Sequence, residues 1–287
     1  MIPFHYKLQC LIAQMKDFFP TPKTWYNKIS FKKGWAWQMK ALITGASSGI
    51  GRDIAKNLSK RGYDLVITAR REERLLELKS ELATDVIVIP ADLSQKEECL
   101  RLYGQTKNED ISVLINNAGY GVFGAFDKTG LPEEIDMLDV NIISAHILMK
   151  LFLKDFIAEN RGYILNVASS AAFLPGPLFS SYYASKAYVL RLTQAVSEEL
   201  RRAGKNVSVS ALCPGPVDTE FNKTAGVQFG FGGLSSPSVA DYAVKKMFAK
   251  KTVIVPGATM KFARFFSKLL PDSLLAKTAY NLQNKKQ

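Results

Sequence analysis

The composition of this 287-residue chain, 47% hydrophobic and 22% charged, is typical of a globular protein and excludes a disordered one. The net charge of +12 lies at the two ends. Residues 1–39 hold six lysines and one aspartate, residues 245–287 hold ten basic residues and one aspartate, and the segment between them carries −2. A neutral body with basic, aromatic-containing ends argues against a nucleic-acid partner and fits a lipid surface better.

Three scattered cysteines and two histidines without other ligands at metal spacing predict neither a disulfide framework nor a metal site. No apolar run reaches the roughly 20 residues that a membrane-spanning helix needs. We therefore expect a cytoplasmic protein, with peripheral contact to the inner face of the membrane as a further possibility.

Residues 1–38 precede the first regular pattern. Residues 21–38 show neither helical nor strand periodicity, and the apolar start lacks the small residues of a signal-peptide cleavage site. The first expected strand follows Met39 directly. We hypothesise that Met39 is the natural first residue and that residues 1–38 are an N-terminal extension. The alternative is an amphipathic membrane anchor around Leu8 to Phe19.

From Met39 onward, short β-branched runs alternate with longer segments at helical spacing, which is typical of βαβ units. Seven strands are expected, at 40–44, 64–68, 86–90, 111–115, 162–168, 206–212 and 252–255. Helices are expected at 50–61, 71–83, 94–107, 131–154, 181–203 and 238–250. The alternation predicts an α/β fold, a Rossmann-type doubly wound seven-stranded parallel sheet in a single domain over 39–256, with ligands at the carboxyl ends of the strands.

The first strand runs into a glycine-rich turn, Thr44 to Gly51 (TGASSGIG), which opens the first helix. Backbone N–H groups and the helix dipole at such a turn can hold a pyrophosphate, and glycines let the backbone approach it. A glycine-rich turn alone is a weak indication, but the strand–turn–helix setting makes it specific. The expected cofactor contacts here are Gly45, Ser47, Ser48, Gly49, Ile50 and Gly51.

The second strand is followed by Arg70 and Arg71, where dinucleotide-binding proteins that prefer NAD(H) carry an acidic residue for the ribose 2′-OH. A guanidinium pairs instead with a 2′-phosphate, so NADP(H) is expected. The alternative is that both arginines only begin a solvated helix. After the third strand, Asp92 and Leu93 are expected at the adenine, although Asp92 could equally be a helix N-terminal carboxylate.

Tyr182 and Lys186 share one face of the helix that follows the fifth strand, because they lie four residues apart. A tyrosine is a poor acid–base group at neutral pH unless a cation stabilises its phenolate, and Lys186 supplies that cation. The hydroxyl of Ser169 can hold the substrate oxygen. By itself, such a Tyr–Lys pair is more often an ordinary surface feature.

The chain resembles the short-chain dehydrogenase/reductase family, in particular its bacterial NADP-dependent members, in six ordered motifs. They are TGASSGIG (44–51), NNAG (116–119), Asn141 in DVN, NVASS (166–170), YYASK (182–186) and PGPVDT (214–219). The resemblance implies an oxidoreductase that transfers a hydride between NADP(H) and a ketone or secondary alcohol. Ala168 stands where many members carry another serine, a departure that leaves the mechanism intact.

The resemblance also implies roles for single residues. Tyr182 would donate the proton, and Ser169 matches the catalytic serine better than Ser170. Asn141 would hold a water that links Lys186 to bulk solvent. The implied cofactor contacts are Asn117, Ala118, Gly119, Tyr182, Lys186, Pro214, Gly215, Val217 and Thr219.

Three apolar, aromatic segments are expected to wall the substrate cleft, which favours a lipophilic carbonyl such as a steroid, a bile-acid-like compound or a fatty-acyl ketone. They are Tyr120–Gly124, Phe173–Phe179 and Gly226–Gly233. Core packing under a lid is the alternative. A homodimer or homotetramer is expected as well. A different class of function, a dinucleotide-binding sensor or scaffold without turnover, stays open.

The basic tail, residues 257–287, is expected to contain an amphipathic helix at 258–270. Its cations Lys261, Arg264 and Lys268 would lie on one face, and Phe262, Phe265, Phe266 and Leu269 on the other. Three roles compete: a lid over the substrate cleft, a buried oligomer surface, or a helix at a membrane surface.

Overall fold

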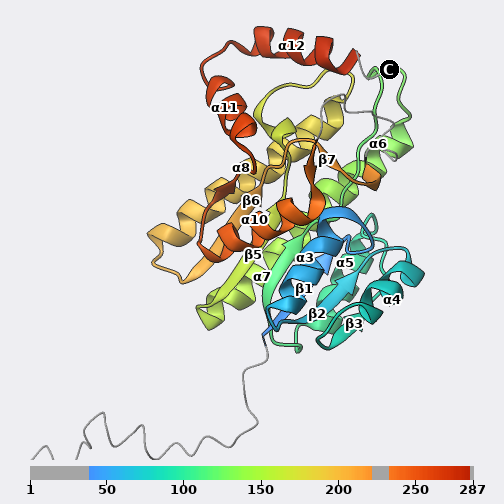
Figure 1. The fold of residues 1–287 in the computed structure, drawn as a ribbon, viewed down its shortest axis with the longest axis vertical. Coiled ribbons are helices and arrows are strands. Elements are labelled where there is room, and N and C mark those ends of the chain that lie inside the picture. The colour runs from blue at the N-terminus through green and yellow to red at the C-terminus, as the bar shows by residue number, and fades with distance from the viewer. Residues whose placement is uncertain (1–38, 222–232, 285–287) are drawn as a thin grey trace, which may run out of the picture. The chain divides into compact units, whose positions relative to one another are not determined.

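Seven parallel strands form one sheet in the order β3-β2-β1-β4-β5-β6-β9 in the computed structural model, which describes residues 39–221 and 233–284 (Figure 1). The strands are β1 (Lys40–Thr44), β2 (Asp64–Thr68), β3 (Val86–Val88), β4 (Ile111–Asn116), β5 (Gly162–Val167), β6 (Val207–Leu212) and β9 (Val253–Ile254). Two short strands, β7 (Val217–Asp218) and β8 (Leu234–Ser235), pair separately. The predicted doubly wound sheet is confirmed.

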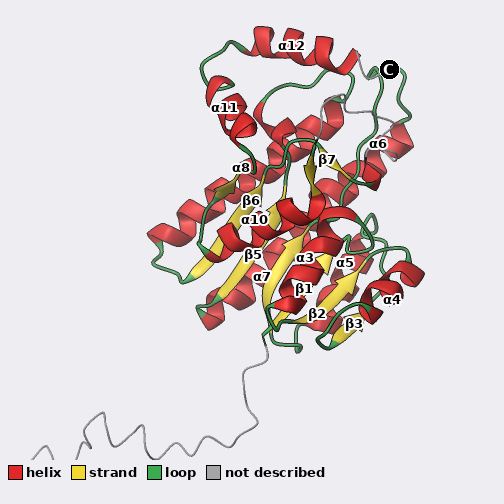
Figure 2. Cartoon of the chain, in the orientation of Figure 1, coloured by secondary structure: helices red, strands yellow, loops and turns green. Residues whose placement is uncertain are grey.

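Helices connect the strands and cover both faces of the sheet (Figure 2). They are α3 (Gly49–Lys60), α4 (Glu72–Ser80), α5 (Lys96–Thr106), α6 (Leu131–Leu138), α7 (Ala145–Glu159), α8 (Ser180–Arg202), α10 (Ser236–Phe248), α11 (Ala258–Phe266) and α12 (Asp272–Asn284). A π-helical segment, Asp139–Ser144, and a 3₁₀ turn, Ser170–Phe173, lie among them.

The core consists of two apolar layers, one on each face of the sheet. Successive strand residues point to opposite faces, so Ala41 and Ile43 of β1 join one layer and Leu42 joins the other. The first layer packs under α3 and α10, and the second under α5, α7 and α8. Because both faces are buried, the strands are mainly apolar, which is why they could be recognised in the sequence.

The prediction of one continuous α-helix at 131–154 is wrong. It begins as α6, passes through the π-helical segment Asp139–Ser144, and continues as α7 to Glu159. The Asn141 amide in this segment bonds the backbone of Tyr120 and the hydroxyl of Ser185, and these contacts accompany the wider turn. Apolar periodicity does not distinguish such a segment from an α-helix.

The tail also differs from its prediction, because the helix expected at 258–270 ends at Phe266 and a second helix, α12, follows. The strands expected at 86–90 and 252–255 are shorter, at three and two residues. In the described part of the chain, no helix has the length and apolarity needed to cross a membrane.

Candidate active site

A cavity of about 470 Å³ lies at the carboxyl ends of the central strands, where the strand order reverses between β1 and β4. Parallel doubly wound sheets bind their ligands at this position. With two exceptions, Gly51 and Asn141, every residue that the sequence assigned to cofactor binding or catalysis lines this cavity. The linear motifs therefore converge on one place.

The glycine-rich turn is held by the NNAG motif on the neighbouring strand. The Thr44 hydroxyl accepts hydrogen bonds from the backbone N–H groups of Asn117 and Ala118, at 2.9 and 3.0 Å. The Asn117 side chain in turn donates to the carbonyl oxygens of Thr44 and Gly45, at 2.9 and 3.0 Å. These contacts fix the loop at the start of α3, where a pyrophosphate would accept N–H donors.

The glycines of this turn are required by its geometry. Gly45 has φ +64°, and a Cβ there would lie 2.8 Å from the Ala118 Cα. Gly49 has φ +55°, a conformation that L side chains rarely adopt. A Cβ on Gly51 would collide with the Asn117 side chain and the Gly45 carbonyl. Gly51 therefore faces Asn117 and the Gly45 carbonyl rather than the cavity.

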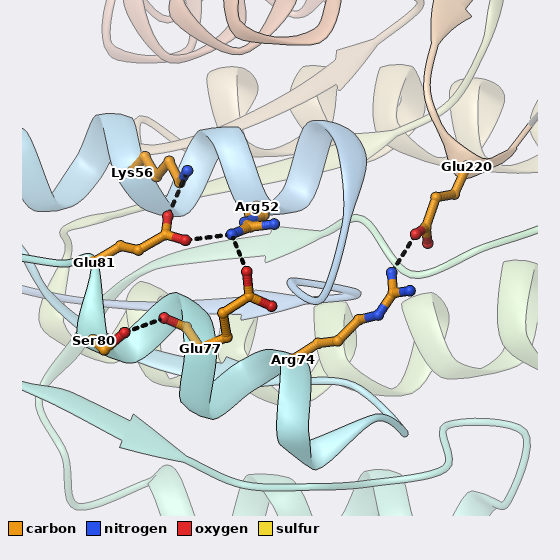
Figure 3. Close-up of polar contacts among 7 residues, drawn as sticks. All are labelled: Arg52, Lys56, Arg74, Glu77, Ser80, Glu81 and Glu220. Carbon is orange, nitrogen blue, oxygen red and sulfur yellow. Dashed lines mark hydrogen bonds and ion pairs between the residues drawn. The ribbon is translucent and has the colours of Figure 1, made fainter.

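Arg70 and Arg71 both line the end of the cavity that adjoins the glycine-rich turn, as the NADP(H) prediction requires. Arg71 donates to the hydroxyls of Ser47 and Ser48 and forms an ion pair of 2.9 Å with Glu220. Arg74 of α4 also pairs with Glu220 (Figure 3). Arg71 is also the N-cap residue of α4, so its position and that of the exposed Arg70 are compatible with both interpretations.

Glu220 is a site residue that the sequence analysis missed. Its two cationic partners lower the pKa of its carboxyl to about 2, so it is ionised at neutral pH. It directly follows the PGPVDT motif and lines the cavity beside the arginines. A carboxylate next to a motif is not distinctive in a linear sequence, and only the fold brings it to α4.

The remaining residues that the sequence assigned to the cofactor line the same cavity. Asp92 and Leu93 line the cavity, and the Asp92 carboxylate accepts from the backbone N–H of Ser94 at 3.1 Å, a local turn contact. Pro214, Gly215, Val217 and Thr219 line it as well. Thr219 lies against the turn, since a Cβ on Gly49 would be 3.1 Å from its methyl group.

Ser169, Tyr182 and Lys186 meet in the same cavity, at the ends of β5 and α8. Tyr182 and Lys186 are 7% and 4% exposed, and the Lys186 Nζ lies 5.8 Å from the Tyr182 ring centroid. The ammonium donates to the Val167 carbonyl at 3.0 Å. The Ser169 hydroxyl accepts from the Ala171 N–H at 3.1 Å, which orients the side chain.

Burial sets the acid–base properties of this group. It raises the pKa of Tyr182 above its ordinary value, and a hydrogen bond with Ser169 acts in the opposite direction. Burial also lowers the pKa of Lys186 to about 8. Both shifts disfavour the charged forms, as desolvation does. An additional positive charge in the cavity would favour the Tyr182 phenolate.

Asn141 lies behind this group, because a Cβ on Gly119 would fall 2.8 Å from its Oδ1 and 3.1 Å from the Lys186 Nζ. Its amide is bonded to the Tyr120 backbone and to Ser185, at 2.9 to 3.0 Å. Asn141 is therefore close to Lys186 and fixed by its surroundings.

The end of the cavity beside Tyr182 is aromatic. The Phe179 ring stacks on Tyr182 with centroids 4.5 Å apart, and Phe221 approaches to 5.4 Å. Of the walls predicted from sequence, Tyr120 and Phe179 line the cavity, whereas Val122 and Phe123 pack into the cluster behind them. The cleft-wall interpretation thus fits Tyr120 and Phe179, and the core-packing interpretation fits Val122 and Phe123. Residues 226–232 lie outside the described part of the chain.

The C-terminal tail contributes one side chain to this aromatic end. Gln283 of α12 is 2% exposed, lines the cavity and donates to the Tyr183 hydroxyl at 2.6 Å. This contact belongs to α12 and not to α11, the helix for which the three roles were considered. Tyr183 itself packs against Gly176 and, like Tyr182, lines the cavity.

Comparisons with known proteins agree with this geometry. A family model described as short chain dehydrogenase matches residues 39–228. The chain is a short-chain dehydrogenase/reductase. An uncharacterised oxidoreductase of Staphylococcus epidermidis is 32% identical over 224 residues, which cover 77% of this chain and 96% of that protein. The family resemblance of the six motifs is confirmed, and with it an oxidoreductase.

Two further relatives are informative about fold and family. A 7beta-hydroxysteroid dehydrogenase of Mediterraneibacter gnavus is 31% identical over 175 residues, 60% of this chain and 66% of that protein. The structure of a short-chain dehydrogenase from Sphingobium yanoikuyae in complex with NADPH has a TM-score of 0.73 and 28% identity, and it covers 80% of this chain and 93% of that one.

Proposed function

We propose that this short-chain dehydrogenase/reductase interconverts a lipophilic ketone and its secondary alcohol with NADP(H), and that Tyr182 transfers the proton. One observation carries the proposal. A single cavity contains the glycine-rich turn, the Arg70–Arg71 pair and the Ser169–Tyr182–Lys186 group. Residues suited to the phosphates of a dinucleotide and residues suited to proton transfer thus lie in one continuous site.

The residues present fit NADP(H). Backbone N–H groups at the start of α3, kept accessible by Gly45, Gly49 and Gly51, would hold the pyrophosphate. Arg70 and Arg71 would pair with the 2′-phosphate. When bound, the nicotinamide supplies or accepts the hydride. The related Sphingobium yanoikuyae enzyme, whose structure contains NADPH, supports this choice of cofactor.

The protein's own part of the reaction is proton transfer and positioning. In ketone reduction, the Ser169 hydroxyl and the Tyr182 hydroxyl would bind the carbonyl oxygen, and Tyr182 would donate its proton to the forming alkoxide. The Lys186 ammonium would stabilise the phenolate that remains. Asn141, held beside Lys186, would position the water through which the proton is replaced. In alcohol oxidation, the same groups would act in reverse.

The substrate class follows from the aromatic end of the cavity. Phe179, Phe221 and the Tyr182 ring present apolar surface next to the reacting hydroxyl. Such a wall favours a steroid-like or acyl ketone over a sugar or a phosphorylated metabolite. The relation to a 7beta-hydroxysteroid dehydrogenase of Mediterraneibacter gnavus supports the same class.

The test is NADPH consumption by the purified protein with steroid ketones, fatty-acyl ketones and small diketones, with Tyr182→Phe as the control. We expect turnover with a bulky apolar ketone that the control lacks. NADPH binding without turnover across the panel would contradict the proposal and favour the sensor or scaffold alternative. Preference for a small polar diketone would contradict only the substrate class.

A further inference from the structure

A second pocket lies between α10, β9 and α11 and shares no lining residue with the cavity described above. Its volume is about 270 Å³. Its lining consists of Tyr242, Lys246, Lys251, Val253, Ile254, Val255, Lys261 and Arg264. Four of these side chains are cations, and none is a carboxylate.

The four cations lack the neutralisation that other basic residues of this protein have. Arg71 and Arg74 pair with Glu220, whereas no ion pair is formed by the pocket's cations among the described residues. Lys246 and Lys261 each lie 5.6 Å from the Tyr242 ring centroid instead. Like charges held this close repel one another, and an anion between them would be stabilised.

The pocket lies along β9, the last strand of the sheet. The N–H groups of Ala211 and Cys213 in and after β6 donate to the carbonyls of Thr252 and Ile254, at 2.8 Å each. Because strand residues alternate in direction, the N–H and C=O groups of Val253 and Val255 both point away from β6, and both residues line the pocket. The four cations of the pocket suit a phosphate.

Next to this pocket, α11 presents an aromatic face to solvent. Arg264 turns toward the body of the protein and lies 5.7 Å from the Phe173 ring centroid. Four large apolar side chains of α11 and the turn after it are more than half exposed: Phe262 (65%), Phe265 (59%), Phe266 (52%) and Leu269 (64%). A contiguous exposed apolar face of this kind marks an interaction surface.

We propose that this pocket binds the phosphate headgroup of an anionic phospholipid while the aromatic face of α11 enters the adjoining acyl region. A soluble phosphate would use the cations but would leave the phenylalanines exposed. A second copy docked through the same face would bring two sets of four cations together. A membrane surface satisfies both features, with apolar side chains inserted and cations at headgroup level. This surface is separate from the proposed redox chemistry and does not depend on it.

The experiment is sedimentation of the full-length protein with vesicles of phosphatidylcholine, with and without phosphatidylglycerol. We expect binding only with phosphatidylglycerol. The double variant Lys246→Gln/Lys261→Gln should weaken vesicle affinity roughly tenfold or more, because two charges at the surface are lost. The matched control Lys60→Gln/Lys79→Gln removes the same charge from α3 and α4 and should weaken it by less than about threefold. Thermal unfolding of all variants verifies that they fold.

Two further measurements separate the alternatives. Phe262→Ser/Phe265→Ser should also weaken vesicle binding and leave the mass in light scattering unchanged. Equal losses in the pocket variant and its control would overturn the proposal, because they would indicate only net charge. The proposal would also be overturned if glycerol 3-phosphate binds the wild type but not the pocket variant, and neither protein binds vesicles. A fall in oligomeric mass in the phenylalanine variant, with vesicle binding intact, would assign the face to a second copy.

Discussion

The two ends of the large cavity differ in where their side chains come from. At the cofactor end, each contributing segment directly follows a strand of the central sheet, and short motifs supply both the turn and the residues that hold it. At the substrate end, Phe179, Phe221 and Gln283 come from a loop, a helical turn after β7 and the tail. The first end is fixed by local sequence, and the second depends on packing between distant segments. The predictions below test this difference.

The largest effect is expected from Tyr182→Phe, where the two ends meet. The ring remains stacked on Phe179, but the transferable proton is lost, so kcat should fall by about 100-fold to 10,000-fold. NADPH affinity should be retained, because the phosphate end is untouched. Steady-state kinetics and NADPH titration check both quantities.

The matched control for this variant is Tyr183→Phe, which alters a hydroxyl bonded to Gln283 rather than one at the Lys186 face. It should keep most of the turnover. If Tyr183→Phe abolishes activity while Tyr182→Phe retains it, the assignment of the proton donor is wrong, although the family is unaffected.

A smaller effect is expected at the cofactor end from Arg70→Asp. The change removes a partner of the 2′-phosphate and supplies an acceptor for the ribose 2′-OH, so the kcat/KM preference should shift from NADP(H) toward NAD(H) by roughly tenfold to a hundredfold. Ratios of kcat/KM for the two cofactors measure it. Arg74→Asp is the comparison, since Arg74 pairs with Glu220 and does not line the cavity. An unchanged ratio in Arg70→Asp would leave Arg71 as the discriminating residue.

The protonation state of Lys186 predicts a pH dependence. Burial lowers its pKa to about 8, so the ammonium loses its proton as the pH rises through this value, and the Tyr182 phenolate loses its stabilising charge. We expect kcat/KM for ketone reduction to decline above about pH 8, approaching tenfold per pH unit. A profile that stays flat to about pH 10, the ordinary range of a lysine, would show that Lys186 is not the titrating group.

Much of the fold and the cofactor end could be predicted from sequence, for identifiable reasons. Buried parallel strands are continuous apolar runs, and the glycine-rich turn and Tyr182–Lys186 spacing have local geometry that a sequence displays. The π-helical segment around Asn141 has no such pattern, since its side-chain bonds to Tyr120 and Ser185 are long-range. Glu220 and Gln283 were missed for the same reason.

The smallest effect, and the sharpest test of the packed end, is expected from Gln283→Ala. Gln283 lies 100 residues from Tyr183 in the sequence, yet its amide bonds the Tyr183 hydroxyl inside the cavity. Its removal takes away this neutral hydrogen bond, so we expect a severalfold rise in KM for the ketone, with kcat nearly unchanged. NADPH affinity should not change, because the bond to Tyr183 lies at the aromatic end of the cavity. The matched control is Leu282→Ala, which removes an exposed side chain of the same helical turn and should leave both constants unaltered. A matching rise in the KM for NADPH in Gln283→Ala would show that α12 supports the whole cavity, and the contrast between its two ends would then fail.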